Sequence, residues 1–316
     1  MAAEQKIPLI IIAGPTATGK TEVAVKVAEE LGGEVVSADS MLIYRFMDIG
    51  TAKPDHKEKK DIPHHLIDVI NPDANFTVAN FQIQARQAIK DIHARGKMPI
   101  LVGGTGFYID AVIFDYDFNH VAPDTGLRQL LKREAEEKGN QVVHDRLRLV
   151  DPETADRIHA NNLKRVIRAL EIYNQTGITG ALQRNQSKKE YRPYDKLFFC
   201  LQYERDELYS RIEKRVDLMI AHGLVQEVQE LLNRGYRPEL VSMQGLGYKE
   251  IVGYLCNRYS LEEAVHMLKR NTRRFAKRQL TWFRRYSNIK WIDMGQYVSN
   301  YHAVDAIIAL ARDKWQ

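Results

Sequence analysis

Residues 7–21 read Ile7-Pro8-Leu9-Ile10-Ile11-Ile12-Ala13-Gly14-Pro15-Thr16-Ala17-Thr18-Gly19-Lys20-Thr21. An apolar run ends at Gly14, and the residues from there to Thr21 match the complete phosphate-binding loop motif, so a bare glycine-rich turn is a poor alternative. In such a loop the backbone N–H groups point inward and bind anionic oxygens. The following helix adds the positive end of its dipole, Lys20 adds a charge, and the Thr21 hydroxyl can hold Mg²⁺. The motif predicts a phosphate site but does not show which ligand carries the phosphates.

The composition is that of a globular protein without special targeting signals. The chain has 316 residues, of which 44% are hydrophobic and 28% are charged, and its net charge is +5. This length suggests about two domains. Two cysteines, Cys200 and Cys256, are too few for a disulfide framework or a zinc site, and they suit a reducing compartment. No apolar run is long enough for a signal peptide or a membrane span, so we expect a cytoplasmic protein with no membrane association.

Strand and helix patterns alternate in the first third of the chain. Buried-strand patterns cover residues 9–13, 34–37 and 99–102, and helical patterns cover residues 21–31 and 77–96, the second with Thr77 as its N-terminal cap. Such alternation predicts an α/β fold with a parallel, doubly wound sheet flanked by helices, and its ligands at the carboxyl ends of the strands.

The pattern then changes to one that is wholly helical. Between residues 115 and 191 we find only helical segments, around 127–138, 141–150, 152–158 and 162–176. A strand pattern returns at 196–202, and the remainder is mainly helical, at 206–222, 225–234, 247–257 and 261–286. We therefore predict a phosphate-loop core of residues 1–114 and 192–316 that carries an all-helical insertion domain of residues 115–191.

Polar residues at the predicted strand ends are candidates for chemistry. Asp39 follows the second strand, where a carboxylate can anchor Mg²⁺ through water, act as a general base or simply form a turn, and spacing alone favours the turn. Thr105 lies between glycines after the third strand, so its hydroxyl faces the same crevice or is incidental to a Gly-Gly turn. Arg211 and Arg215 lie one helical turn apart and could close over a diphosphate. Without further context a solvated helix face is the simpler interpretation of that pair.

The strongest charge signal lies in residues 267–285, which contain no acidic residue. The basic residues there are Lys269, Arg270, Arg273, Arg274, Lys277, Arg278, Arg284 and Arg285. Uninterrupted positive charge is costly unless a polyanion neutralises it, whereas a solvated face usually mixes signs. We therefore favour a nucleic-acid contact on this helix. A smaller basic group, Lys164, Arg165 and Arg168, lies on the predicted insertion.

Several longer motifs are specific enough to compare with known families. They are Gly14 to Thr21, Asp39-Ser40, Ile43-Tyr44-Arg45, Met47 to Pro54, His64 to Asp68, Gly103 to Tyr108, Arg165 to Glu171, Gln244 to Tyr248 and Arg273 to Phe283. Together they closely resemble the bacterial type of the tRNA dimethylallyltransferases, also called tRNA isopentenyltransferases, over nearly the whole chain. The chain departs from the family pattern at Phe46, where many members have glycine, and at Leu42, where some have glutamine.

The resemblance implies an enzyme that transfers a dimethylallyl group from dimethylallyl diphosphate to N6 of the adenosine just 3′ of the tRNA anticodon, with release of diphosphate. The phosphate loop then holds the prenyl diphosphate rather than ATP, with Mg²⁺ as cofactor and Thr21 as the metal-binding residue. Asp39 matches the residue that contacts the adenine amino group and acts as base. Thr105 matches the one that bonds the leaving diphosphate, and Lys20 neutralises charge on it.

The resemblance also implies a grip on the anticodon stem-loop by the insertion and the basic helix, with the target base flipped out. Together with Arg211 and Arg215 at the diphosphate, we expect these tRNA-binding residues in a monomeric enzyme: Asp39, Ser40, Met41, Leu42, Thr105, Arg128, Lys164, Arg165, Arg168, Gln244, Gly245, Gly247, Arg273, Arg274, Lys277, Arg278 and Gln279.

Three other functions remain as alternatives. A phosphate-loop kinase that uses ATP accounts for the loop but leaves the basic helix and the insertion without a purpose. A prenyltransferase that acts on free adenylate shares the chemistry but needs no surface for an anticodon arm. An RNA-binding protein with a vestigial loop would not need intact Lys20, Thr21, Asp39 and Thr105.

Overall fold

The computed structural model describes residues 6–114, 116, 118, 124–180, 193–296 and 301–315. The chain divides into two compact units, residues 1–112 with 192–316 and residues 113–191. This division lies within two residues of the borders expected from the sequence. The larger unit holds the sheet and the phosphate loop, and the smaller one is helical throughout its described part.

A six-stranded parallel sheet forms the centre of the larger unit, which confirms the predicted class of fold. Its strands are β1 (Ile7–Ala13), β2 (Gly33–Ser37), β3 (His64–His65), β4 (Met98–Gly103), β5 (Tyr194–Gln202) and β6 (Lys290–Asp293), in the spatial order β3-β2-β4-β1-β5-β6. Residues Leu9 to Ala13 are completely buried, because a parallel sheet is covered on both faces. The short strands β3 and β6 were not predicted, since neither carries a continuous apolar run.

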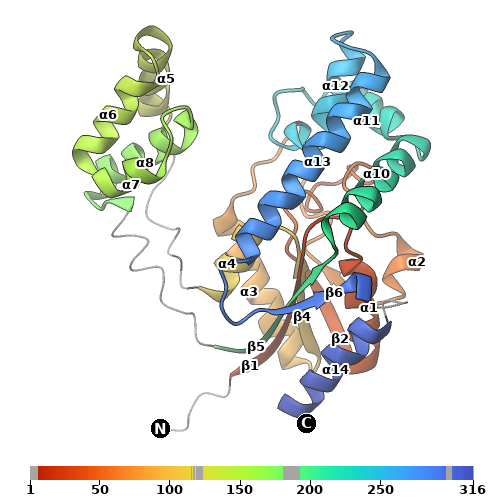
Figure 1. Cartoon of the computed structure of the whole chain (residues 1–316). Coiled ribbons are helices and arrows are strands. Elements are labelled where there is room, and N and C mark those ends of the chain that lie inside the picture. Colours follow the sequence, from red (N-terminus) through yellow and green to blue (C-terminus); the bar gives the residue numbers. More distant parts are fainter. Residues whose placement is uncertain are drawn as a thin grey trace. The chain divides into compact units, whose positions relative to one another are not determined.

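Helices cover both faces of this sheet. The elements that follow the strands are α1 (Lys20–Leu31), α2 (His56–Lys59), α3 (Val78–Ala94), α4 (Gly106–Ile113) and α14 (Tyr301–Trp315), with a short 3₁₀ helix, η2, at Met294–Gln296. Helices α1 and α14 pack on the face that carries Ile10 and Ile12, and Figure 1 shows α3 on the other side of the sheet. The predicted cap of α3 is confirmed, because Oγ1 of Thr77 accepts a hydrogen bond from the backbone N–H of Asn80.

A second layer of helices lies beyond the carboxyl ends of the strands (Figure 1). It contains α10 (Arg205–Ala221), α11 (Leu224–Asn233), η1 (Ser242–Gln244), α12 (Tyr248–Leu255) and α13 (Leu261–Phe283). These helices share a core with the loop after β2, through Ile43, Tyr44 and Met47. That core fixes the loop residues next to the phosphate loop, which is what positions the site.

The smaller unit has its own hydrophobic core. Its helices are α5 (Thr125–Lys138), α6 (Asn140–Val150), α7 (Pro152–Arg157) and α8 (Leu163–Thr176). Leu131, Val143, Leu147 and Val166 pack together at its centre. No helix in the described parts of either unit is long and apolar enough to cross a bilayer.

Candidate active site

The phosphate loop joins β1 to α1, as its motif predicts. Its backbone lies so close to β5 that a Cβ at Gly14 would be 2.6 Å from the carbonyl oxygen of Leu201. Gly19 has a φ of 80° and lies just before the first residue of α1. Gly14 therefore has no room for a side chain, and Gly19 has a backbone conformation that favours glycine.

A cavity of about 590 Å³ opens above the loop, within the larger unit. Residues 16–21 of the phosphate loop line it, together with the ends of β2 and β4, residues 39–42 and 50–52, and parts of α10, α13 and the 244–249 segment. It therefore brings together residues that lie more than 200 positions apart in the sequence. Ligand sites at the carboxyl ends of parallel strands are expected for this fold.

Lys20 projects into this cavity with a strongly altered pKa. Its Nζ donates to the carbonyl oxygen of Pro15 at 2.6 Å. The pKa of Lys20 is lowered to about 8, first by burial and then by the nearby Arg215, although Asp39 partly opposes the shift. Burial also lowers the pKa of Arg215, while Asp39 raises it. Two enclosed cations with one carboxylate beside them form a site suited to an anion such as diphosphate.

The two arginines of α10 do not lie on a solvated face, so that interpretation of the sequence was wrong. Nε of Arg211 donates to the carbonyl oxygen of Ala17 at 3.0 Å, and its guanidinium lies over the ring of Tyr203. Arg215 lines the cavity and donates to the carbonyl oxygen of Thr51 at 3.3 Å. Their hydrogen-bond partners lie more than 150 residues away in the chain, and helical spacing cannot reveal contacts of that kind.

The turns after β2 and β4 lie against each other and hold Asp39 near Thr105. The N–H of Ser40 donates to Oγ1 of Thr105 at 3.1 Å, and the N–H of Thr105 donates to the carbonyl oxygen of Ala38 at 3.2 Å. Oδ1 of Asp39 accepts from the N–H of Met41 at 2.8 Å, so this carboxylate does form a turn. Asp39 also lines the cavity, and its Oδ2 has no hydrogen-bond partner among the described residues. The turn and a role as base are therefore compatible.

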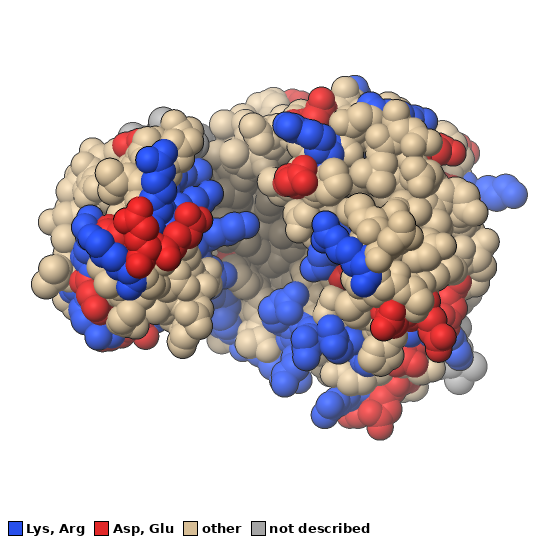
Figure 2. Space-filling model, turned by 90° about the horizontal axis from the view of Figure 1, so that it is seen from above, with Lys and Arg blue, Asp and Glu red and all other residues tan. Residues whose placement is uncertain are grey.

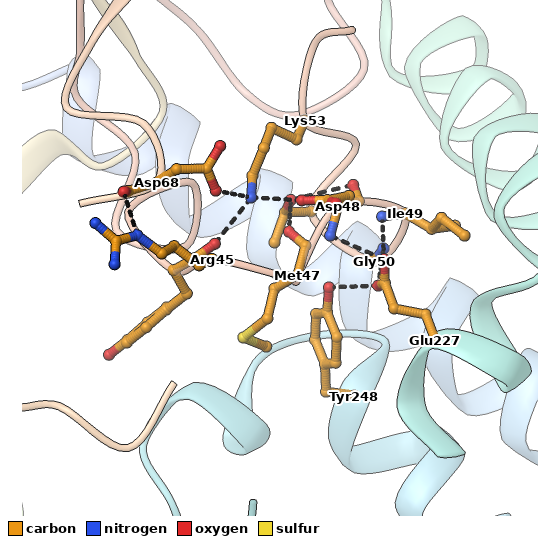
Figure 3. A network of polar contacts seen from close by, with 11 residues as sticks. Arg45, Met47, Asp48, Ile49, Gly50, Lys53, Asp68, Glu227 and Tyr248 are labelled. Atoms are coloured by element: carbon orange, nitrogen blue, oxygen red, sulfur yellow. Dashed lines mark hydrogen bonds and ion pairs between the residues drawn. The ribbon is translucent and has the colours of Figure 1, made fainter. Parts of the chain in front are cut away.

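The loop of residues 48–52 is held by Glu227 of α11, a residue that sequence reasoning missed (Figure 3). Oε2 of Glu227 accepts from the N–H groups of Asp48 at 2.8 Å and Ile49 at 2.7 Å, and its Oε1 accepts from the N–H of Gly50 at 3.0 Å. The hydroxyl of Tyr248 donates to the same Oε1 at 2.7 Å. Because residues 50–52 line the cavity, this carboxylate fixes one of its walls.

Lys53 closes the same loop from the other side. Its Nζ lies 2.5 Å from Oδ1 of both Asp48 and Asp68, and it donates to the carbonyl oxygen of Tyr44 at 2.8 Å (Figure 3).

Phe46, in the same loop, has a φ of 66°, a backbone conformation that favours glycine. This conformation accounts for the glycine that many members of the family have at this position. The side chain of Phe46 lies under the guanidinium of Arg234.

The basic segment predicted from the sequence forms α13 and the residues directly after it. Its positive charge was expected to be unpaired, but acidic residues of other helices pair with three of its side chains. Lys269 pairs with Asp217 at 2.6 Å, Arg273 pairs with Glu213, and Arg285 pairs with Asp110 at 3.2 Å. These acids belong to α10 and α4. Five exposed residues have no acidic partner in the described part of the chain: Arg270, Arg274, Lys277, Arg278 and Arg284. Figure 2 shows Lys and Arg side chains gathered on one face of the larger unit.

Three of the predicted tRNA-binding side chains have partners within the protein. Gln279 is buried and bonds the phosphate loop and the turn after β4. In the smaller unit, Arg128 and Arg168 both pair with the fully buried Glu171, at 2.8 Å for Arg128. The buried carboxylate of Glu171 thus holds two arginines whose side chains remain partly exposed. Lys164 and Arg165 are exposed.

Of the other predicted tRNA-binding residues, several line the cavity, whereas Thr105 and Gly247 do not. Ser40, Met41, Leu42, Gln244 and Gly245 all line it. Gly247 is buried, with a φ of 91° directly before α12, and shapes the backbone rather than the cavity wall. Met41 touches the 244–249 segment, because a Cβ at Gly245 would be 2.4 Å from Cε of Met41.

The donors in the cavity suit a phosphate-bound Mg²⁺ better than a metal held by the protein alone. Thr21 and Asp39 both line the cavity with oxygen atoms. Among the described residues no group of three or more His, Cys, Asp and Glu is placed to hold a metal ion. Mg²⁺ that is bound mainly by substrate phosphates needs only one or two protein oxygens.

A parallel α/β sheet, a phosphate loop and buried cations around one cavity place the chain among the phosphate-loop proteins. The chain belongs to the IPP transferase family, whose model matches residues 42–286. It is 52% identical to the tRNA dimethylallyltransferase of Alkaliphilus oremlandii. The 305 aligned residues cover 95% of this chain and 96% of that protein.

Solved structures agree with this assignment. The tRNA isopentenylpyrophosphate transferase of Bacillus halodurans is 44% identical, with a TM-score of 0.72 and 98% of each chain covered. A eukaryotic dimethylallyltransferase, described as acting on tRNA, is 30% identical with a TM-score of 0.82, over 97% of this chain and 79% of that one. The resemblance seen in the sequence motifs is thereby confirmed.

Proposed function

We propose that this protein transfers a dimethylallyl group from dimethylallyl diphosphate to N6 of the adenosine directly 3′ of a tRNA anticodon, and releases diphosphate. One observation carries the proposal: a single cavity is lined by the phosphate loop with Lys20, by Arg215 and by Asp39. A donor with an anionic leaving group and an acceptor that must lose a proton can therefore react in one place.

In this reaction the N6–carbon bond forms while the carbon–oxygen bond to the diphosphate breaks. The diphosphate leaves with the electron pair, and its growing negative charge is stabilised by the backbone N–H groups of residues 17–21, by Lys20 and by Arg215. When bound, Mg²⁺ would supply further charge neutralisation at the diphosphate, and the hydroxyl of Thr21 would help to hold it. The hydroxyl of Thr105 is proposed as a hydrogen-bond donor to the leaving diphosphate.

Asp39 is proposed to act on the acceptor, the adenine amine. The exocyclic amine of adenine is a weak nucleophile, so a carboxylate within hydrogen-bond distance is needed to take its proton. The bond from Met41 orients Oδ1 of Asp39 and leaves Oδ2 for the amine. Reaching the amine also requires an unstacked base, and a base in an RNA loop costs little to extrude.

The exposed basic residues of α13 are proposed to bind the anticodon arm, since a free nucleotide would not need them. A monomer is proposed as the active form. A kinase that uses ATP is not favoured, because it leaves Asp39 and this basic surface unused.

Release of diphosphate tests the proposal. Protein, Mg²⁺ and dimethylallyl diphosphate should give free diphosphate only when an RNA hairpin with adenosine 3′ of the anticodon is added. Release that is equally fast without RNA, or with free adenosine monophosphate as acceptor, would contradict the proposal that an anticodon arm is the substrate.

A further inference from the structure

Gln279 differs from its neighbours on α13. Lys277 and Arg278 are exposed, whereas the side chain of Gln279 is only 6% exposed. Its Oε1 accepts a hydrogen bond from the backbone N–H of Thr16 at 3.0 Å. Its Nε2 donates to the carbonyl oxygen of Gly104 at 2.8 Å. One amide group therefore joins the phosphate loop to the turn that carries Thr105.

The turn after β4 is shaped to receive α13. A Cβ at Gly104 would be 2.2 Å from Nε2 of Gln279, and a Cβ at Gly106 would be 2.1 Å from Cδ1 of Trp282. Any side chain at either position would collide with the helix. The close approach of α13 thus explains both glycines around Thr105: Gly104 leaves room for the amide of Gln279, and Gly106 leaves room for Trp282.

The two hydrogen bonds have opposite polarity. Thr16 presents a donor and Gly104 presents an acceptor, and an uncharged amide matches both at once. A carboxylate could accept from Thr16 but could not donate to Gly104, and an apolar side chain would leave both backbone groups unsatisfied in a buried place.

We propose that Gln279 is a positioning residue that sets the spacing between the phosphate loop and the Thr105 turn, and that it does not contact tRNA. This inference rests on the proposed function, because it concerns the two loops that surround the leaving diphosphate. Neighbouring positions of one helix then have separate tasks: Lys277 and Arg278 are exposed and available to RNA, Arg278 at the edge of the cavity, and Gln279 holds the reaction centre. Misplacement of reacting groups by about 1 Å can cost about a hundredfold in rate.

The variant Gln279→Met keeps the size of the side chain and removes both hydrogen bonds. We expect its single-turnover rate at saturating RNA and prenyl donor to fall by roughly tenfold to a hundredfold, with the Kd for the RNA hairpin unchanged. Gln279→Glu should also be slow, and its KM for dimethylallyl diphosphate should rise, because the new negative charge lies beside the phosphate loop.

Gln82→Met is a matched control. Gln82 on α3 is also buried, and its Nε2 donates to the carbonyl oxygen of Ala111 at 2.9 Å. The change removes a comparable buried amide outside the cavity, so it should lower the melting temperature by a similar amount while the single-turnover rate stays near that of the parent chain. A slow Gln279→Met variant beside an active Gln82→Met variant separates positioning from general loss of stability.

Two results would overturn the inference. One is weaker RNA binding by Gln279→Met with a normal rate at saturation, which would make Gln279 an RNA contact. The other is a rate equal to that of the parent chain. If the parent chain itself transfers no dimethylallyl group to RNA, the proposed function fails, which is a different outcome from an active parent with an unimpaired Gln279→Met variant.

Discussion

The backbone N–H of Ser40 donates a hydrogen bond to Oγ1 of Thr105 at 3.1 Å, which ties the turn after β2 to the turn after β4. The two turns also touch directly, since a Cβ at Gly103 would be 2.1 Å from the carbonyl oxygen of Ala38. Asp39 lies between Ala38 and Ser40, so its backbone is fixed on both sides. The carboxylate is therefore held in place before any substrate binds, which is the condition for an efficient base.

Replacing Asp39 by asparagine should isolate the proton transfer. The amide oxygen of Asp39→Asn can still accept from the N–H of Met41, so the turn should persist, but the group no longer takes a proton. We expect the single-turnover rate to fall by about 10²–10⁴-fold, with little change in the Kd for RNA. A rate close to that of the parent chain would remove Asp39 from its role as base.

The lowered pKa of Lys20 predicts a pH dependence of diphosphate binding. The free protein loses the Lys20 proton near pH 8, and only the protonated form attracts the anion, so the affinity for inorganic diphosphate should decrease as the pH rises through about 8. The variant Arg215→Gln should bind diphosphate more weakly at every pH. The pH at which its affinity begins to fall should be higher, because Arg215 no longer lowers the pKa of Lys20. Calorimetric titrations over this pH range measure both effects.

Lys90→Gln provides the control for that experiment, because Lys90 is an exposed residue of α3 outside the cavity. Its profile should match that of the parent chain. A profile for Arg215→Gln whose break stays at the same pH would show that Arg215 does not influence Lys20.

Glu227→Gln should loosen the wall of the cavity formed by residues 50–52. The amide cannot accept from all three backbone N–H groups and Tyr248 together, so at least one partly buried donor loses its partner, at a cost of about 1 kcal/mol in the free energy of unfolding. Because Thr51 holds Arg215, we also expect a higher KM for dimethylallyl diphosphate. Urea unfolding and steady-state kinetics give the two readouts.

Glu230→Gln on the same helix is the matched control, since Glu230 is exposed and lies 3.8 Å from Arg234 at the surface. It should change stability very little. If Glu227→Gln behaves like this control in both measurements, the carboxylate network of Figure 3 does not support the site.

The basic residues of α13 should not contribute equally to RNA binding. Lys277 and Arg278 are exposed without acidic partners in the described part of the chain, whereas Arg273 is already paired with Glu213. The double change Lys277→Gln with Arg278→Gln should reduce the slope of log affinity against log salt by about 0.7–0.9 for each lost phosphate contact. Arg273→Gln should change that slope less.

Filter binding of the RNA hairpin at several salt concentrations measures these slopes. An unchanged slope for the double variant would place the RNA surface elsewhere, and an equal loss for Arg273→Gln would show that its pairing with Glu213 opens when RNA binds.

Local motifs carried the predictions that succeeded. The phosphate loop, the strands at 9–13, 34–37 and 99–102, and the cap at Thr77 all depend on residues close together in the sequence, and the structure confirms them. The helices of the insertion were also placed within about two residues, because their apolar positions repeat at helical spacing. Strand β6 and helix α14 were missed, as the first has only four residues and little apolar character.

Contacts between distant segments explain what the sequence could not show. Glu227 looks like any surface glutamate of an amphipathic helix until the loop at 48–50 is seen around it. Gln279 lies in a basic run, so it was grouped with the RNA-binding residues although its side chain points into the protein. The ion pair of Arg128 was hidden for a similar reason, because its partner Glu171 lies on another helix, and its contact with tRNA stays a prediction.

The central claim is that this site breaks a carbon–oxygen bond rather than transferring a phosphoryl group. The direct measurement is to incubate the protein and Mg²⁺ with unmodified tRNA that carries adenosine 3′ of the anticodon, supply either dimethylallyl diphosphate or ATP, digest the tRNA and determine the masses of its nucleosides. The account predicts that one adenosine gains the mass of a dimethylallyl group with the prenyl donor and none with ATP. Phosphoryl transfer from ATP, or tRNA left unmodified by the prenyl donor, would contradict it.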